Sequence, residues 1–363
     1  MAFDPRQEDC LRLVLSAMKR DRIYPLNDAA YIERTMLAYQ NDPASLIKTD
    51  RDRSFHLVCL ATELIDYQMP FLASEDEINK LIERVERYLT EAVRIDEHNW
   101  DAKRMLFTVQ SQSDDELVKY LLDNRSDVAA EAKRLIDEAD DPYAREFAND
   151  LGQHPYQRWL ASLASRQFIA GQYRCALATV EECLAIAPLD WAGVRHTGML
   201  ALAKLEVDRA ELQEFRARHA LAYQGLVPFA ANQPNAQAGS QPLDPWSLIA
   251  EMSLAYRAFD YEGATETLRE ILRLFPHAPQ TLFVQAEFPE GMFSRVHIMP
   301  GSDDELVVAL SEATPLLQEG MGTPDSASFA LWIAEHELVQ AALSEQDLQM
   351  LEQMGGMATG GGA

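Results

Sequence analysis

The chain has 363 residues, of which 47% are hydrophobic, and a formal net charge of −26 from 58 acidic and 32 basic side chains. The field of such a chain repels nucleic-acid phosphates and anionic membrane surfaces, so we expect neither as a ligand. No apolar run reaches the ~18 residues of a transmembrane helix, and the first ten residues are charged, unlike a signal peptide. These features predict a cytoplasmic protein.

Sequence motifs that would carry chemistry are missing. The chain has no GxGxxG, GxxxxGK[ST] or GxSxG pattern, so no dinucleotide site, phosphate loop or hydrolase nucleophile is predicted. Its four cysteines form no CxxC pair and are expected to be reduced and mostly buried. An HE pair begins at His336, but Gln340 stands where a zinc protease needs its second histidine. We therefore predict no catalytic residue, cofactor or metal site.

Residues 1–150 predict an irregular helical region. A long helical pattern covers about Glu75 to Ile95, and the segment Glu91–Met105 at its end parallels the later segment that starts at Glu181. This echo predicts another repeat boundary. Its matched positions are Ala92/Cys183, Ile95/Ile186, Trp100/Trp191 and Arg104/Arg195.

The peptide SDDELV occurs twice, at Ser113–Val118 and at Ser302–Val307. Three carboxylates together could suggest a cation site. The same pattern is a helix capping box, in which the serine accepts a backbone amide and the glutamate three residues on reaches back. We therefore predict a helix start at each copy.

Residues 157–190 predict a helical hairpin. Small and large apolar residues recur at helical spacing on both sides of a turn marked by Gly171 and Tyr173, and Pro188 ends the second helix. The stripe of the first helix contains Leu160, Leu163 and Ala164, and that of the second contains Ala176, Val180, Cys183, Leu184 and Ile186.

Two further frames of 34 residues follow. The frame that starts at Trp191 is degenerate but places Gly198, Ala210 and Ala217 where small residues let helices approach closely. The frame Pro245–Ala278 carries the apolar stripe more fully and ends near Pro276. Residues 225–244 lie between them and are rich in Pro, Gly, Asn and Gln, which predicts a flexible insertion.

These spacings resemble the tetratricopeptide repeat, and the stretch after Pro276 is loosely similar to bacterial members of that family. The resemblance implies an all-α superhelical solenoid of antiparallel helical hairpins, because single hairpins become stable only when neighbours stack. The predicted parts are an irregular region at 1–150, repeats at 151–286, a nonhelical segment with capping helices at 287–354, and a disordered tail at 355–363.

The resemblance also implies a binding groove on the first helix of each hairpin. A guanidinium donates two parallel hydrogen bonds to a carboxylate, and aromatic rings can seat an apolar anchor, so the groove would suit a protein or peptide segment. Internal pairing of the arginines with local carboxylates is the alternative. The groove residues are Arg158, Ser165, Arg195, Trp246, Ser253, Tyr256 and Arg257.

Two functions of different classes remain open at this point. The first is a cytoplasmic scaffold that binds a protein or peptide and has no catalytic activity. The second is a helical enzyme or regulatory subunit with its site in 1–150 or in 286–302, where Arg295 and His297 lie in a break of the helical pattern. A deep pocket of polar groups with shifted pKa would favour the second function.

Overall fold

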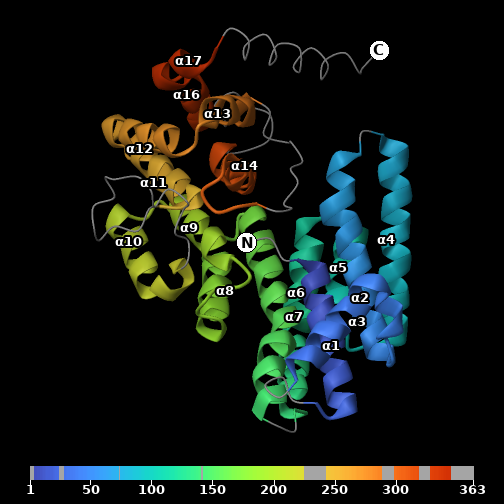
Figure 1. Cartoon of the computed structure of the whole chain (residues 1–363). Coiled ribbons are helices and arrows are strands. Elements are labelled where there is room, and N and C mark those ends of the chain that lie inside the picture. The colour runs from blue at the N-terminus through green and yellow to red at the C-terminus, as the bar shows by residue number, and fades with distance from the viewer. Residues whose placement is uncertain are drawn as a thin grey trace. The chain divides into compact units, whose positions relative to one another are not determined.

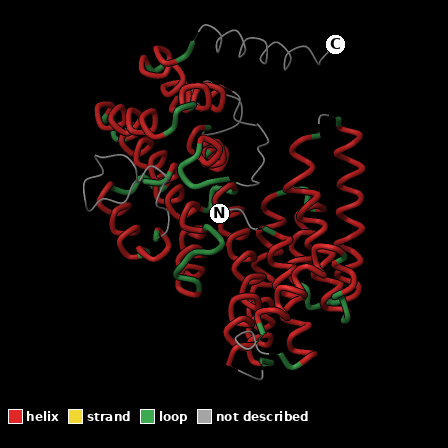
Figure 2. The backbone as a smooth tube through the Cα atoms, in the orientation of Figure 1, coloured by secondary structure: helices red, strands yellow, loops and turns green. Residues whose placement is uncertain are grey.

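The computed structural model describes residues 4–23, 28–72, 74–139, 142–224, 243–287, 298–318 and 328–344, without the side chains of 142–144, 146–150 and 285–287. All regular structure in these ranges is helical, as predicted (Figure 2). No helix described there combines the length and apolar character that crossing a bilayer requires. The chain forms two compact units, an N-terminal unit up to Ala170 and a C-terminal unit from Gly171 (Figure 1).

The N-terminal unit contains long helices and two short irregular turns, and in Figure 1 it runs from blue to green. A stretch of π-helix and a 3₁₀ turn, η2 (Leu64–Gln68) and η3 (Met69–Phe71), follow the third helix. The α-helices are α1 (Pro5–Asp21), α2 (Ala29–Asn41), α3 (Asp50–Glu63), α4 (Glu75–Ile95), α5 (Trp100–Gln110), α6 (Asp114–Asp137) and α7 (Pro142–Ile169).

Three apolar clusters hold this unit together. One joins α1 and α2, a second joins α3, α4 and α5, and the third joins α5, α6 and α7. In the third cluster the rings of Trp100 and Trp159 meet edge to face at 5.6 Å, and the Trp159 indole N–H donates to the Leu121 carbonyl. Helix α7 therefore packs along α6, which fixes the face that α7 buries.

The C-terminal unit consists of shorter helices. The third predicted frame forms as expected, with α11 packed against α12, and α9 packs against both α8 and α11. Its helices of more than four residues are α8 (Tyr173–Ile186), α9 (Val194–Lys204), α10 (Arg209–Arg218), α11 (Pro245–Arg257), α12 (Tyr261–Leu274), α13 (Ala278–Glu287), α14 (Asp303–Glu312), α16 (Ser328–Glu335) and α17 (Glu337–Ala342).

Helix ends of the first frame agree with the sequence, and the division between the two compact units falls inside this frame. Helix α7 ends at Ile169 and α8 begins at Tyr173, as predicted. The division between the two units falls in the turn between them, because α7 is 28 residues long and buries Trp159 and Leu163 against α6. A continuous solenoid through residues 157–190 therefore stays a prediction.

The three small residues that the second frame places at helix contacts do not all lie at such contacts. A Cβ on Gly198 would lie 2.8 Å from the Phe215 ring and 3.0 Å from Val180, so this glycine does permit a close approach. Ala210 and Ala217 are exposed, so the prediction that they line helix contacts is wrong. The reason is that α10 has only ten residues and turns a different face, with Leu212 and Phe215, inward.

Both SDDELV copies begin helices, as predicted. The hydroxyls of Ser113 and Ser302 accept the backbone amides of Glu116 and Glu305 at 3.3 Å. Each glutamate reaches back one residue further than a capping box requires and accepts the amide just before the serine, at 3.4 Å and 2.6 Å. The aspartates favour the positive end of the helix dipole, so the cluster needs no cation.

Several predictions fall outside the described residues. They are residues 225–242 of the insertion, residues 288–297 of the break, residues 345–354 of the capping helices and the tail at 355–363. The cysteines are free within the described part of the chain, and three of them are buried as expected. Cys175 is exposed, in keeping with the prediction that most but not all of the thiols are buried.

Candidate functional site

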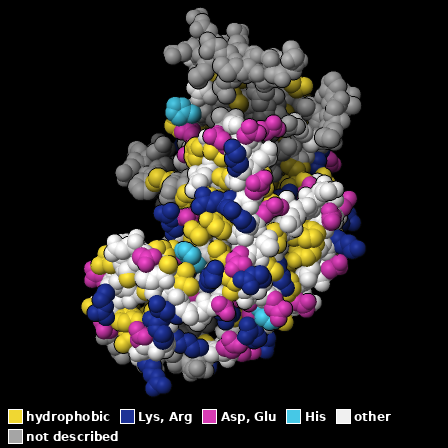
Figure 3. All heavy atoms as spheres, turned by 90° about the vertical axis from the view of Figure 1, so that its right-hand side faces the viewer, with side chains coloured by type: hydrophobic (Ala, Val, Ile, Leu, Met, Phe, Trp, Pro, Cys, Tyr) yellow, Lys and Arg dark blue, Asp and Glu magenta, His cyan; other side chains and the backbone are white. Residues whose placement is uncertain are grey.

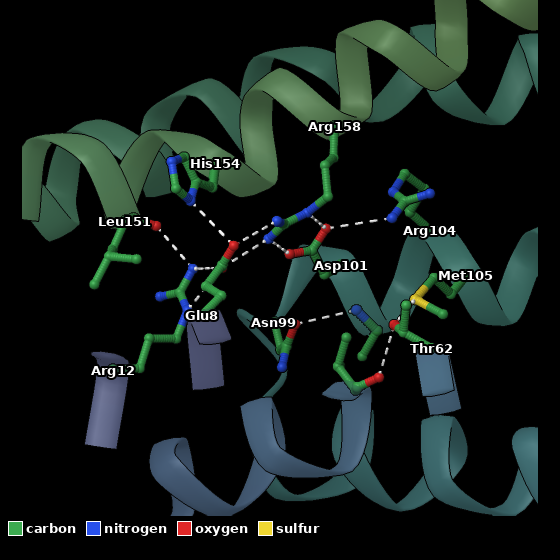
Figure 4. Close-up of polar contacts among 12 residues, drawn as sticks. Glu8, Arg12, Thr62, Asn99, Asp101, Arg104, Met105, Leu151, His154 and Arg158 are labelled. Carbon is green, nitrogen blue, oxygen red and sulfur yellow. Dashed lines mark hydrogen bonds and ion pairs between the residues drawn. The ribbon is translucent and has the colours of Figure 1, made fainter. Parts of the chain in front are cut away.

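A buried charge cluster lies at the centre of the N-terminal unit, where α1, α5 and α7 meet (Figure 4). Arg158 from α7 lies between Glu8 of α1 and Asp101 of α5, and its Nη1 donates to Glu8 at 2.9 Å while Nε donates to Asp101 at 2.9 Å. Arg12 and His154 contact the same Glu8 carboxylate, at 2.7 Å and 3.1 Å. The cluster thus ties together three helices that are far apart in sequence.

The charges in this cluster compensate one another. Burial by itself would raise the pKa of Glu8, but the guanidinium groups of Arg158 and Arg12 outweigh it and hold that pKa well below its usual value. Burial opposes ionisation of Asp101 as well, and Arg158 with Arg104 lowers its pKa. Both carboxylates are therefore ionised at neutral pH and paired, whereas a general acid or base needs a pKa near the working pH.

A separate small hollow, with a cavity volume of only about 10 Å³, lies in the same unit between α3, α6 and α7. Phe55 and Trp100 form part of its wall, and the Arg51 guanidinium lies 3.6 Å from Glu131 and 3.7 Å from Glu138. Burial lowers the pKa of Arg51, and the carboxylates oppose that shift. The charged groups Arg51 and Glu131 of its lining are thus paired, whereas the buried indole N–H of Trp100 has no hydrogen-bond partner among the described residues.

The predicted groove residues divide between the two units. Arg158 and Ser165 belong to the N-terminal unit, and Arg158 lies in the buried charge cluster. The rest belong to the C-terminal unit. Arg195 is only 4% exposed, and its guanidinium donates to Asp190 at 2.9 Å beside the Tyr223 ring. These two arginines each have a carboxylate partner inside their own unit.

Trp246 and Ser253 of α11 are also buried. The Trp246 ring stacks on His196 with centroids 3.7 Å apart, and its N–H donates to Glu312 at 2.8 Å. Burial and the charge of Arg195 lower the pKa of His196, so this imidazole is neutral at pH 7. The Ser253 hydroxyl is fully buried, so neither Trp246 nor Ser253 is accessible to a partner.

The last two predicted residues lie at an exposed end of α11. Arg257 is paired with Glu206 at 3.0 Å. Tyr256 belongs to an aromatic surface in which its ring lies 5.7 Å from Tyr261 and 5.3 Å from Trp332. We define the aromatic surface as Tyr256, Phe259, Tyr261, Phe329 and Trp332.

Two rings of the aromatic surface are open to solvent. Phe259 is 79% exposed and Tyr261 is 48% exposed, with their centroids 6.4 Å apart. Phe329 lies beneath and is buried, 5.1 Å from Tyr256. The turn between α11 and α12 thus presents large apolar side chains instead of the polar ones that usually occupy such turns.

Charge is mixed over the face drawn in Figure 3, where acidic and basic side chains are interspersed with apolar ones. The net charge of −26 is therefore not gathered in one acidic patch on that face. Among the described residues, no group of three or more His, Cys, Asp or Glu side chains is placed to hold a metal ion.

Comparisons with known proteins return no relative. No family model, no curated protein and no solved structure matches the chain. The repeat resemblance therefore rests on the residues alone.

Sequence reasoning missed the residues that define both sites. Glu8 and Asp101 carry no local signal, because only the packing of α1 and α5 against α7 brings them to Arg158. Phe259 did have a signal: it stands at the fifteenth position of its frame, where the first frame has Gly171. A phenylalanine at a turn position suited to glycine is the kind of local conflict that marks function.

Proposed function

We propose that this chain is a cytoplasmic, non-catalytic helical scaffold of tetratricopeptide type that binds a segment of another protein. The observation that carries the proposal is the aromatic surface of the C-terminal unit. Exposed aromatic side chains are over-represented at the centres of protein interfaces, because a ring buries a large apolar area at little cost in side-chain entropy. The aromatic surface includes Tyr256, one of the residues that the repeat resemblance assigns to the groove.

The arginines that the repeat resemblance assigns to the groove support placing the partner contact at the C-terminal end of α11, where the exposed rings lie. The guanidinium groups of Arg158, Arg195 and Arg257 each contact a carboxylate of the same unit. A partner carboxylate would have to displace these ion pairs. Contact with the exposed rings requires no such displacement.

Site-specific photocrosslinking in the native cells tests the proposal. A benzoylphenylalanine at position 259 should form a crosslink to a discrete other protein, since the native ring is already exposed there. The same group at Leu189, an apolar residue of the C-terminal unit that is 73% exposed, is the matched control. Equal labelling from both positions, or none from 259, would contradict the proposal.

A further inference from the structure

We infer that the aromatic surface binds a segment that carries a lysine or arginine next to an apolar side chain. This inference rests on the proposed function and adds the chemistry of the partner. Two observations support it: the backbone conformation of Phe259, and the charges around the exposed rings.

Phe259 occupies a backbone conformation that suits glycine. Its φ is +60°, and the amides of Phe259 and Asp260 close the end of α11 by donating to Tyr256 and Ala255. In this type of helix end the left-handed residue is usually glycine, because a side chain there is strained. Gly171 takes the corresponding turn of the first frame with φ +75°.

Packing of the Phe259 ring inside the unit does not offset the free-energy cost of this backbone conformation, because most of the ring surface faces solvent. A glycine would close the turn at lower free energy, so folding by itself gives no reason for a phenylalanine. Residues held in unfavourable conformations cluster at functional positions. Arg22, Asp190 and Glu206 share a positive φ, but their side chains are polar. The apolar and exposed ring of Phe259 is therefore best explained by a contact with another molecule.

Charges near the exposed rings are mostly negative. Asp260 and Glu262 flank Tyr261 and are exposed. On the α16 and α17 side, the exposed Glu335 and Glu337 lie close in sequence to Trp332 and His336, whose rings are 5.0 Å apart.

The cations on this side compensate only part of that charge. Arg257 is paired with Glu206. Lys204 lies near Arg257, and Arg269 of α12 lies near His336. The excess of carboxylates favours a cationic partner, and the net charge of the chain adds to the attraction.

The rings themselves suit the same partner. An aromatic face attracts an ammonium or guanidinium group through its quadrupole, and the remaining ring area can cover an apolar side chain. A basic side chain beside an apolar one would therefore meet both the carboxylates and the rings. An acidic segment would meet like charge.

A displayed library of random dodecapeptides, selected on the full chain, tests the inference. Peptides recovered on the wild type should be rich in Lys or Arg next to an apolar residue. Replacing Phe259 with Ala should weaken them about tenfold or more, as expected for an interface anchor. Phe71→Ala is the matched control, because Phe71 is 73% exposed in the other unit, and it should leave their binding unchanged.

A second variant separates binding from folding. Phe259→Gly should raise the thermal midpoint of the C-terminal unit by about 2–4 °C, since it removes the left-handed side chain, and should still lose the peptides. A lowered midpoint would show that the ring serves the fold and would overturn the inference.

The remaining outcomes are distinguishable. Peptides that depend on Phe259 but are acidic or uncharged would overturn the inference and leave the proposed function standing. Basic peptides that bind equally to the Phe259→Ala and Phe71→Ala variants would reflect the general charge of the chain and overturn the inference. Failure to recover any peptide that depends on Phe259 would count against the proposed function itself, as would self-association of the chain that Phe259→Ala abolishes.

Discussion

At the scale of single residues, the N-terminal unit depends on an arginine that a groove model would assign to a ligand. Arg158 is largely buried and neutralises two carboxylates that approach it from different helices. Removing one member of a buried ion pair is costly because the partner is left desolvated and unpaired. The contribution of Arg158 to stability can therefore be measured as a coupling free energy between Arg158 and Asp101.

We predict that Arg158→Met lowers the free energy of unfolding by about 3–5 kcal/mol. The double variant Arg158→Met/Asp101→Asn should be less destabilised than the sum of its single changes, because the second change removes a charge that the first left unpaired. Urea denaturation of the four proteins checks this. Additive effects would mean that the two groups are not coupled.

Ala176 gives a second prediction at this scale. It is fully buried in α8, and a large side chain there would overpack the C-terminal unit. Ala176→Phe should cost about 1–3 kcal/mol. Ala210→Phe is the control, since Ala210 is exposed and the change should be nearly neutral there. Thermal unfolding of both variants makes the comparison, and equal midpoints would contradict the assignment of the buried face.

At the scale of elements, the sequence similarity between residues 91–105 and the segment that starts at Glu181 has a structural counterpart. Helices α4 and α8 end at its paired isoleucines, Ile95 and Ile186. After α4, Asn99 caps α5, which begins at the next residue. After α8, helix α9 begins only at Val194, and the Asp190 carboxylate accepts its first two amides. Asn99 and Asp190 are both buried, so polar side chains within the core fix both helix starts.

We predict that Asp190→Ala is much more destabilising than a cap deletion at the surface. The Asp190 carboxylate accepts the amides of Val194 and Arg195 at 2.8 Å and 3.0 Å and also pairs with the Arg195 guanidinium. The loss should be about 3–5 kcal/mol because a buried guanidinium is left without its carboxylate. Asp208→Ala, which removes the cap of α10, should cost about 1 kcal/mol. Similar losses in chemical denaturation would show that the buried pair adds nothing.

At the scale of the whole molecule, the described helices form two units that differ in helix length and in what holds them together. The N-terminal unit consists of long helices around a charge cluster, whereas the C-terminal unit consists of shorter helices. An acidic chain with paired, buried carboxylates should respond to acid in a defined way, because their folded pKa values are lower than those of an unfolded chain.

We predict that the N-terminal unit loses stability as the pH falls below about 4. A carboxylate with a depressed folded pKa stabilises the fold at any pH above its unfolded pKa, roughly 4 for Glu8 and Asp101, and this contribution disappears as the pH falls through the folded value. The variant Glu8→Gln/Asp101→Asn should therefore unfold with a flatter pH dependence than the wild type. Denaturation curves between pH 7 and 2 test it, and parallel pH profiles would contradict the role of these groups.

Much of the local structure could be predicted from the sequence because it depends on near neighbours. Helix starts at the two SDDELV copies, helix ends before Pro188 and Pro276, and the burial of the apolar stripes all follow from side chains within a few residues. Those signals predicted correctly that the regular structure of the described residues is all helical. They also placed the third helical hairpin.

Contacts between distant segments were decided only by the tertiary structure. Glu8 meets Arg158 across 150 positions, and no periodic pattern encodes that distance. Packing of distant segments also pairs Arg257 with Glu206, whereas Arg195 finds its carboxylate locally, at Asp190. The position of Phe259 at a turn suited to glycine can be read from the sequence, but its exposure cannot, since a helical stripe gives the face of a side chain and not whether another element will cover it.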